Sequence, residues 1–295
     1  MKVQYLSVCS GIEAASVAWH PLGWQPVAFS EIDPFTSAVL AHHYPEVPNL
    51  GDMKRYKEWE YERLGTIDLL VGGTPCQSFS VAGLRKGLED PRGNLMFTYL
   101  GIIESIRPRW VIWENVPGVL SSNSGRDFGA FVGALGQLGY GWAYRIMDAQ
   151  WFGVPQTRRR VFVVGHIGDT RRAAKVLFES ESVRRSPTPR RPKTQGFTAD
   201  VANCLRSGGN GGVPSSRGEH LVGSQDNATT TVRRLTPTEW ERLQGFPDQY
   251  TAIPWKGHLA SACPDGPRYK SLGNSMAVPV MHWIGKRIAD QSQEA

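Results

Sequence analysis

The sequence lacks the long apolar runs and the leader pattern that would direct a chain into or across a membrane. No uninterrupted apolar stretch reaches the roughly 18 residues of a membrane-spanning helix. Lys2 precedes a short apolar run, but Glu13 follows and no small-residue cleavage pattern appears, so no signal peptide is expected. No internal repeat is found. We therefore expect a soluble, cytoplasmic protein with no membrane partner.

Cysteine is also scarce. The chain has four cysteines without a Cys-x-x-Cys pair or a nearby histidine spacing that would build a zinc site: Cys9, Cys76, Cys204 and Cys263. No metal site is predicted, and each cysteine has to be interpreted by itself.

The basic excess is confined to one stretch of the chain. The net charge is +6, and between Arg171 and Lys193 eight basic residues stand against two acidic ones, an excess equal to that of the whole chain. A charge run of this kind is often only a solvated surface loop. It also suits a polyanionic partner such as nucleic acid.

Short β-rich runs alternate with helix-compatible segments through the first 165 residues. This alternation predicts an α/β fold in which βαβ units stack on a parallel sheet. The candidate strands are nearly continuous in apolar character, as strands covered on both faces should be. They are Gln4–Val8, Val27–Glu31, Asp68–Val71, Trp110–Trp113, Tyr144–Asp148 and Val161–Gly165.

The composition changes after residue 170 to Arg, Pro, Ser, Thr and Gly, and no clear period survives. Five residues near the centre of this stretch, Gly208-Gly209-Asn210-Gly211-Gly212, are nearly all glycine. We predict a small loop-rich domain at 171–232, inserted into a main domain made of 1–170 and 233–295.

Ordered signals resume at Thr236. This residue can cap a helix, Pro237 fits the first helical position, and Glu239 completes a capping box. Gly245 supplies a left-handed stop, so a helix of about two turns is predicted. A last helix is expected over Val278–Ala289.

The run Val71-Gly72-Gly73-Thr74-Pro75-Cys76-Gln77 is a strand end that opens into a loop presenting a cysteine. Ligands in open α/β sheets gather beyond the carboxyl ends of strands, so the Cys76 thiol stands where chemistry usually occurs. The ordinary alternative is a small buried side chain, the commonest role of an unpaired cysteine.

Two further strand boundaries carry polar groups. Glu114-Asn115 follows the four apolar residues Trp110–Trp113, so the Glu114 carboxyl should be partly buried, with a raised pKa that lets it carry a proton. Alone, it could be a helix cap. Arg158 and Arg160 share one face by the two-residue period of a strand, which suits a phosphate or a carbonyl oxygen, or else a solvated turn.

Together these runs resemble the cytosine-5 DNA methyltransferase family, of bacterial or phage type. The Pro75-Cys76-Gln77 loop is similar to the family's nucleophile motif, Glu114-Asn115-Val116 to its acid motif, and Gln156–Arg160 to its Gln-x-Arg-x-Arg motif. Ser7–Glu13, Ser30–Asp33 and Gly51-Asp52 resemble its cofactor motifs, and Arg234–Tyr250 and Gly273–Ser275 its last two motifs. They occur in family order and spacing across most of the chain.

The resemblance implies a Rossmann-like methyltransferase domain that uses S-adenosylmethionine, with S-adenosylhomocysteine as product. The segment 171–232 occupies the place of the family's target-recognition domain. One departure concerns the cofactor loop, since the family's Phe-x-Gly-x-Gly reads Cys9-Ser10-Gly11-Ile12-Glu13 here. An aromatic face for the adenine and the second glycine are therefore absent.

By this resemblance, Cys76 would attack carbon 6 of cytosine while Glu114 engages N3 and the exocyclic amine. Arg160 suits the O2 carbonyl, with Asn115 and Arg158 holding the site together, and both arginines should lower the pKa of the thiol. The cofactor would contact eleven residues: Ser10, Gly11, Ile12, Glu31, Ile32, Asp52, Met53, Pro75, Leu95, Asn274 and Ser275.

The target base must leave the duplex to reach such a pocket. The loop Gln77–Gly93 could close over double-stranded DNA as a basic lid, and arginines of the segment 171–232 could hold phosphates and read guanine edges. The expected DNA contacts are Gln77, Arg85, Lys86, Arg184, Arg185, Arg190, Arg191, Gly209 and Asn210.

The family contains lone enzymes and members of restriction-modification systems, so a cognate restriction endonuclease is compatible with the resemblance. We expect a monomer or weak homodimer in a bacterial cell or phage host. Three alternatives stay open at this point: a tRNA cytosine-5 methyltransferase, a DNA-binding regulator without catalysis, and a thiol enzyme acting on a small molecule. The joint presence of Cys76, Glu114 and Arg160 argues against the regulator.

Overall fold

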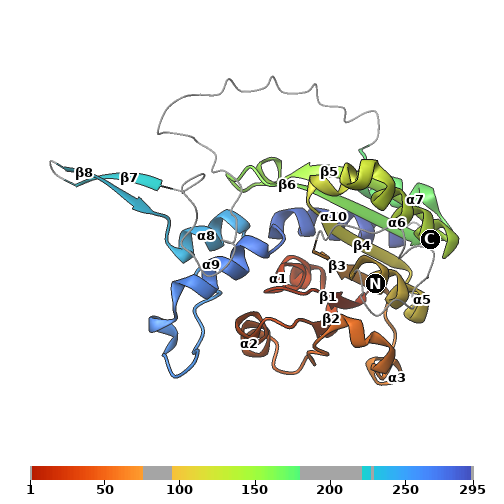
Figure 1. Cartoon of the computed structure of the whole chain (residues 1–295), viewed down its shortest axis with the longest axis horizontal. Helices are drawn as coiled ribbons and strands as arrows, with labels where there is room; N and C mark the ends of the chain where they lie inside the picture. Colours follow the sequence, from red (N-terminus) through yellow and green to blue (C-terminus); the bar gives the residue numbers. More distant parts are fainter. Residues whose placement is uncertain (1, 76–94, 180–220, 227–228, 294–295) are drawn as a thin grey trace.

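The computed structural model describes residues 2–75, 95–179, 221–226 and 229–293. Its centre is a six-stranded sheet in the order β2-β1-β3-β4-β6-β5 (Figure 1). The strands are β1 (Gln4–Val8), β2 (Gln25–Ser30), β3 (Leu69–Gly72), β4 (Trp110–Asn115), β5 (Tyr140–Asp148) and β6 (Arg159–Ile167). Each of the six predicted strands is present. Their ends shift by a few residues, and β5 begins at Tyr140 rather than Tyr144.

The sheet is mixed, so the predicted parallel sheet is confirmed for β1 to β4 and is wrong for the pairings of β6. β1 to β4 pair in parallel, whereas β6 runs antiparallel to both β4 and β5. The physical reason lies in the connection from β5 to β6. In the ten residues between Asp148 and Arg159 the only helical turn is η6 (Ala149–Trp151), too short to carry the chain back for a parallel pairing.

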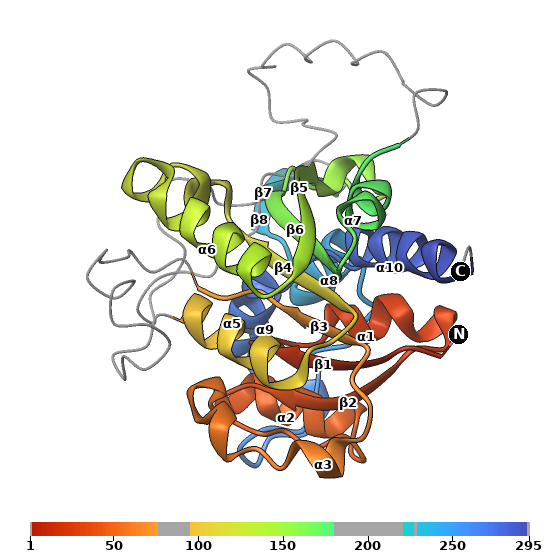
Figure 2. The same cartoon turned by 90° about the vertical axis from the view of Figure 1, so that its right-hand side faces the viewer.

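Helices cover both faces of the sheet, because consecutive side chains of each strand point to opposite sides. Tyr5, Leu69 and Trp110 belong to one buried cluster, and their neighbours Leu6, Leu70 and Val111 belong to the other. Figure 2 shows α5 (Leu95–Ile106) and α6 (Arg126–Gln137) on one side, with α1 (Ala14–Trp19), α7 (Thr170–Leu177) and α10 (Val278–Gln293) on the other.

In the described residues, four further helical elements precede α5. They are η1 (His20–Leu22), α2 (Pro34–His43), η2 (Met53–Glu58) and α3 (Tyr61–Leu64). Of these, η1 packs against α1 and α10, and η2 packs against α5. The turns η4 (Pro117–Leu120) and η5 (Ser122–Gly125) join β4 to α6. None of the helices in the described residues combines the length and apolar character needed to cross a bilayer.

The segment 171–232 does not begin as a loop. Residues 170–177 form α7, where Ala173, Val176 and Leu177 are fully buried, and α7 packs against β5, β6 and α10. Three of the basic residues in the charge run therefore lie on a helix of the sheet layer, namely Arg171, Arg172 and Lys175. The predicted boundary between the two domains at residue 170 stays a prediction. Residues 171–177 pack as part of α7 against the central sheet.

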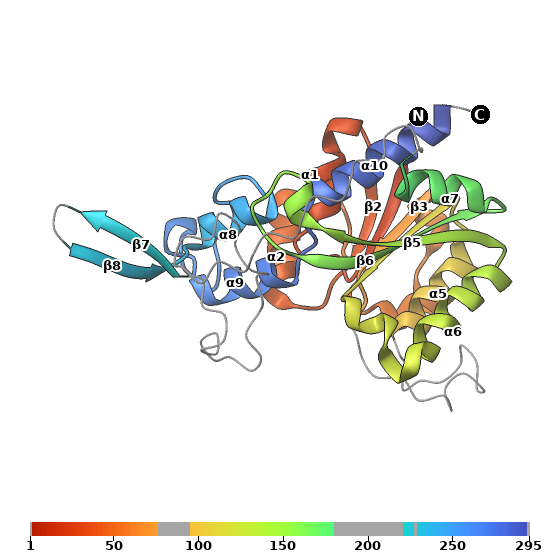
Figure 3. The same ribbon diagram turned by 90° about the horizontal axis from the view of Figure 1, so that it is seen from above.

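Further along the same segment, β7 (Leu221–Asp226) and β8 (Thr229–Arg234) pair as an antiparallel hairpin. Figures 1 and 3 show this hairpin projecting away from the sheet layer, beyond α8 and α9. Residues 180–220, which hold the glycine-rich run and four of the arginines expected to contact DNA, lie outside the described residues.

The C-terminal segment returns to the sheet. The predicted capping box is confirmed in α8 (Pro237–Gln244), where Thr236 and Glu239 cap each other and Gly245 has φ +82°. After η8 (Ala260–Ala262) and α9 (Asp265–Asn274), α10 extends to Gln293, beyond the predicted end at Ala289. It packs against α1, and the indole Nε1 of Trp19 donates to the carbonyl of Met281 at 2.7 Å. The return brings α9 to the edge where the strands end.

Candidate active site

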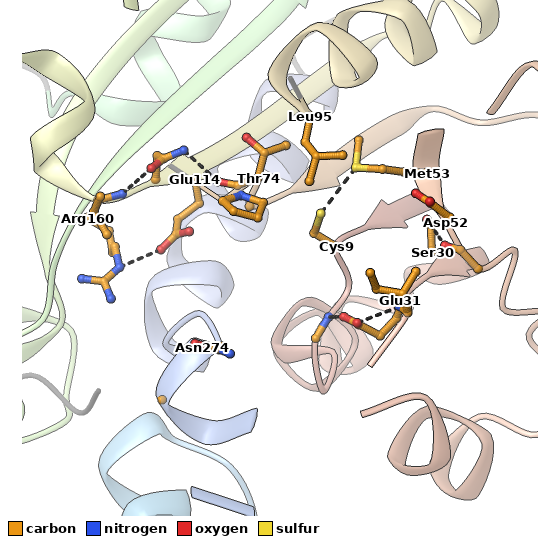
Figure 4. Close-up of a pocket in the computed structure, with 18 of the residues that line it drawn as sticks. Cys9, Ser30, Glu31, Asp52, Met53, Thr74, Leu95, Glu114, Arg160 and Asn274 are labelled. Atoms are coloured by element: carbon orange, nitrogen blue, oxygen red, sulfur yellow. Dashed lines mark hydrogen bonds and ion pairs between the residues drawn. The ribbon is translucent and has the colours of Figure 1, made fainter. Parts of the chain in front are cut away.

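A cavity of about 420 Å³ lies at the carboxyl ends of β1 to β4 (Figure 4). Four parallel strands end together, so the residues that follow each of them meet at one edge of the sheet. The cavity is lined by Cys9, Gly11, Ser30, Glu31, Ile32, Gly51, Asp52, Met53, Gly73, Thr74, Pro75, Leu95, Glu114, Asn115, Val116, Arg158, Arg160, Gly273 and Asn274.

One end of the cavity is built by the loops after β1 and β2. The Glu31 carboxylate accepts the amide N–H of Gly11 at 2.9 Å and the N–H groups of Ile32 and Asp33 at 2.8 Å each. These bonds tie the β1 loop to the end of β2. Gly11 has φ +57°, which glycine adopts without strain. Asp52 caps η2 by accepting from the N–H of Lys54 at 2.9 Å.

The thiol of Cys9 stands at the same end, between these two carboxylates and Met53. Its sulfur lies 3.4 Å from the Met53 sulfur. Burial, reinforced by the charges of Glu31 and Asp52, raises the pKa of the Cys9 thiol to about 12. A thiol with such a pKa is protonated at neutral pH and is a poor nucleophile. Cys9 therefore contributes a small sulfur surface where the family pattern has an aromatic ring.

The other end is built around Glu114 at the end of β4. Its carboxyl is buried, and Arg160 Nε lies 3.1 Å from Glu114 Oε1 (Figure 4). Burial raises the pKa of Glu114 above its ordinary value, against the opposing charges of Arg160 and Arg158. This direction agrees with the expectation from the sequence, and burial outweighs two guanidiniums. The site thus holds a carboxyl group prepared to carry a proton.

Thr74 accepts hydrogen bonds from two side chains of β4. The amide Nδ2 of Asn115 donates to the Thr74 carbonyl at 2.9 Å, and the indole of Trp113 donates to the Thr74 hydroxyl at 2.9 Å. The backbone that leads into Pro75 and Cys76 is therefore fixed to β4. Gly73 completes this arrangement, because a Cβ there would lie 2.8 Å from Glu114 Oε2.

Arg158 joins β6 to the C-terminal motif. Its Nη2 donates to the carbonyls of Gly273 at 3.2 Å and Ser275 at 2.7 Å, and its backbone N–H donates to the Asp148 carboxylate at 2.9 Å. Gln156, also fully buried, donates to the Leu243 carbonyl of α8 at 2.8 Å. The Gln-x-Arg-x-Arg run therefore fastens the C-terminal helices to the sheet, and Arg160 is its member that points at Glu114.

The structure brings most of the predicted site residues together. Of the catalytic set, Glu114, Asn115, Arg158 and Arg160 line the cavity, as do eight of the predicted cofactor residues: Gly11, Glu31, Ile32, Asp52, Met53, Pro75, Leu95 and Asn274. Ser10 and Ser275 line a small adjoining cavity. Ile12 lines neither of the two, because its side chain is fully buried in the core.

The predicted nucleophile and the expected DNA contacts belong to other parts of the chain. Cys76, Gln77, Arg85, Lys86, Arg184, Arg185, Arg190, Arg191, Gly209 and Asn210 lie outside the described residues. Pro75, the residue before Cys76, lines the cavity together with Glu114.

Several lining residues were not among the predicted ones: Cys9, Ser30, Gly51, Gly73, Thr74, Val116 and Gly273. All of them lie within two residues of a predicted site residue, so their position beside a motif was the signal by which the sequence could have identified them. What the sequence could not show is that Thr74 anchors two side chains of β4.

The fold and this pocket are those of a Rossmann-like methyltransferase. The solved structure of the Schizosaccharomyces pombe Dnmt2 methyltransferase superposes with a TM-score of 0.72, covering 98% of this chain and 99% of that one at 18% identity. A putative DNA modification methyltransferase encoded within a prophage of Escherichia coli gives a TM-score of 0.66 at 17% identity, covering 99% of this chain and 100% of that one. At these identities the likeness concerns the fold.

The chain belongs to the C-5 cytosine-specific DNA methylase family, whose model matches residues 3–208 and 174–290. It is 30% identical to the type II methyltransferase M2.BsuMI of Bacillus subtilis (strain 168), covering 98% of this chain and 75% of the relative. It is 35% identical to a phage P1 protein named DNA N-6-adenine-methyltransferase, covering 96% of this chain. The chain spans 61% of the length of that phage protein.

Proposed function

We propose that this protein transfers a methyl group from S-adenosylmethionine to carbon 5 of a cytosine within a specific double-stranded DNA sequence. The observation that carries the proposal is the buried Glu114 carboxyl, with a raised pKa and with Arg160 beside it, at the rim of a pocket that continues to Glu31 and Asp52. Membership of the family supports the same reaction.

The pocket fits the proposed cofactor. Its volume of about 420 Å³ lies in the usual range for small-molecule sites. In the pocket, Asp52 would accept from an adenine amine and Glu31 from ribose hydroxyls, while Ile32 and Leu95 would offer apolar cover. S-adenosylmethionine supplies a methyl group carried on a positively charged sulfur. The product S-adenosylhomocysteine would leave from the same residues.

The chemistry requires an acid and a nucleophile, since carbon 5 of cytosine is a weak nucleophile by itself. The Cys76 thiolate adds to carbon 6 while protonated Glu114 donates to N3, and the electron pair so released lets carbon 5 take the methyl group. A base removes the proton from carbon 5, and Cys76 leaves as the carbon 5–carbon 6 double bond forms again. Arg160, next to Glu114, would bind the O2 carbonyl.

Cytosine cannot reach Glu114 from inside a duplex, so the base has to be extruded into the pocket. The basic run of 171–193 and the loop Gln77–Gly93 are the segments that we assign to DNA. Relatives that carry the name type II methyltransferase are consistent with a cognate restriction endonuclease, and relatives from Bacillus phages named orphan methyltransferases are consistent with a lone enzyme.

The name of the phage P1 relative raises a second candidate, methylation of the exocyclic amine of adenine. That amine can attack the methyl group directly and needs neither a thiol that adds to the ring nor an acid at a ring nitrogen. The buried Glu114 would then have no purpose. The arrangement therefore favours cytosine, and the experiment below separates the two bases.

The decisive experiment uses labelled S-adenosylmethionine with duplex DNA, and tRNA in parallel, followed by digestion and identification of the methylated base. We expect 5-methylcytosine in DNA. When 5-fluorocytosine replaces the target base, release should fail and the protein should remain attached to DNA through the Cys76 peptide, as seen by mass spectrometry. The adduct should be absent in Cys76→Ser. N6-methyladenine, methylated tRNA alone, or an adduct on Cys9, Cys204 or Cys263 would overturn the proposal.

A further inference from the structure

The residue that replaces the second glycine of the cofactor loop, Glu13, is a buried carboxyl with an unusual backbone. Only 1% of its surface is exposed, and its φ of +61° lies in the left-handed region that favours glycine. It caps the six-residue helix α1 by accepting from the N–H of Ser16 at 3.1 Å. A serine or asparagine would cap as well without placing a carboxyl group in the core.

Neutral hydroxyls surround the Glu13 carboxyl. Ser7 donates a short hydrogen bond to Oε1, and the Ser16 hydroxyl donates to Oε2 at 2.6 Å. In the described part of the chain, Glu13 forms no ion pair and no hydrogen bond with a lysine, arginine or histidine. A buried carboxyl group that ionises usually has such a partner.

Among the residues that the structure describes, the titratable groups that face Glu13 carry no positive charge. They are Tyr5 from β1, Tyr44 after α2 and Tyr250 after α8, and Glu114 from β4 lines the same small cavity. His43 stacks on Tyr250 with ring centroids 4.0 Å apart, and burial lowers the pKa of that imidazole. Burial raises the pKa of Glu13 to about 7, although hydrogen bonds from Ser16 and Ser7 oppose the rise. At neutral pH a nearby cation would thus decide whether the carboxyl is ionised.

Glu13 lines a side cavity of about 40 Å³ next to the main pocket. Cys9, Gly11, Gly73, Glu114 and Asn274 line both cavities, so the two are neighbours. The volume of the side cavity exceeds the roughly 10 to 15 Å³ that a cavity needs to hold one water molecule. An ammonium group is of similar size. The side cavity therefore has room for one small polar group, with Glu13 among its lining residues.

The orientation in which the cofactor would bind under the proposed function indicates which polar group would occupy the side cavity. The adenine belongs near Asp52 and the ribose near Glu31, while the methyl group must be close to Glu114 and Pro75, where the target base enters. The amino-acid end is then left for the residues shared with the side cavity, such as Gly11 and Asn274. This end carries an α-ammonium group.

We propose that Glu13 binds the α-ammonium group of S-adenosylmethionine in the side cavity. This assignment rests on the proposed use of that cofactor. It gives the buried carboxyl its missing cation and accounts for a glutamate in a backbone conformation where glycine is favoured.

The test compares two ligands in two proteins by calorimetry, with no DNA present. The ligands are S-adenosylhomocysteine and its analogue in which hydrogen replaces the α-amino group. The unaltered protein should prefer S-adenosylhomocysteine by roughly tenfold or more, the usual range for a hydrogen bond between charged groups. In Glu13→Gln, which keeps the size and one acceptor oxygen, this preference should fall several-fold. Asp169→Asn, which alters the carboxylate cap of α7 away from the pocket, should keep it.

A second measurement follows protons rather than affinity. Because the pKa of Glu13 is raised in the free protein, a bound cation should ionise it and release a proton at about pH 6, and the affinity should rise from about pH 6 to pH 7. The release, measured in two buffers of different ionisation enthalpy, should disappear in Glu13→Gln and with the analogue. It should persist in Ser7→Ala, which removes only one donor to the carboxyl.

The outcomes separate this inference from the proposed function. Equal ligand preference in the unaltered protein and Glu13→Gln, or equal proton release by both ligands, would overturn the role of Glu13 and leave the methyltransferase assignment intact. Failure of the unaltered protein to bind S-adenosylhomocysteine at all would overturn both.

Discussion

Glu114 and Arg160 face each other across the antiparallel pair β4 and β6, with Oε1 and Nε 3.1 Å apart. The pairing of Asn115 with Val161 brings the two residues to the same end of the pair. The guanidinium lies within ion-pair distance of the carboxyl, yet burial still raises the pKa of Glu114. The pair can therefore present a proton donor and a positive charge to one substrate base.

The first prediction concerns this proton. Glu114→Gln should slow methylation by roughly a hundredfold or more, the scale of a lost general acid. Because the protonated form of Glu114 is the proposed proton donor, the rate should fall as the pH rises through the raised pKa of this group. Arg160→Ala removes a charge that lowers this pKa, so the alkaline limb should move to higher pH while the maximal rate drops. An alkaline limb that Arg160→Ala leaves in place would contradict the coupling.

The second prediction concerns Gly73. A methyl group in Gly73→Ala would lie 2.8 Å from Glu114 Oε2 and 3.2 Å from the Met276 methyl, so the carboxyl would have to shift. We expect about a tenfold or larger loss of single-turnover rate, since small displacements of reacting groups are costly. Gly118→Ala is the matched control, because its added methyl meets nothing within 4 Å. Equal rates for the two variants would refute the steric argument.

The third prediction concerns the cofactor end of the pocket. Glu31→Ala and Asp52→Ala should each weaken binding of S-adenosylhomocysteine by about 1 to 3 kcal/mol, since each leaves a ligand donor without an acceptor. Glu31→Gln separates charge from shape, because its remaining oxygen can still accept from the Gly11 N–H. Glu46→Ala, an exposed carboxylate outside the pocket, is the control and should bind normally in calorimetry. Unchanged affinity in both alanine variants would remove the pocket assignment.

The fourth prediction concerns the basic run. Neutralising Arg184, Arg185, Arg190 and Arg191 should weaken DNA binding and flatten its dependence on salt by up to about 0.9 in log–log slope per lost phosphate contact. Binding of S-adenosylhomocysteine should stay the same. Arg63→Gln is the control, because Arg63 is an exposed arginine of α3 that pairs with Glu60. A salt slope that is the same in all proteins would show that the run is only a solvated loop.

Local signals decided much of the fold from the sequence alone. The helix at Pro237 follows from Thr236, Glu239 and Gly245, all within ten residues of one another, and the structure confirms each cap. The strands follow from short apolar runs, and the burial of Glu114 follows from the four apolar residues before it. Such features depend on neighbours in the chain, so a sequence can show them.

Tertiary structure decided the rest, because those contacts join residues far apart in the chain. The antiparallel direction of β6 depends on how residues 149–158 return the chain, and a strand pattern reads the same in either direction. From its neighbours in the sequence, Arg158 could lie in a solvated turn, whereas in the fold it donates to the carbonyls of Gly273 and Ser275. The sequence shows Glu13 only as the residue in place of the second glycine of the cofactor loop, whereas the fold buries it beside a side cavity, away from water.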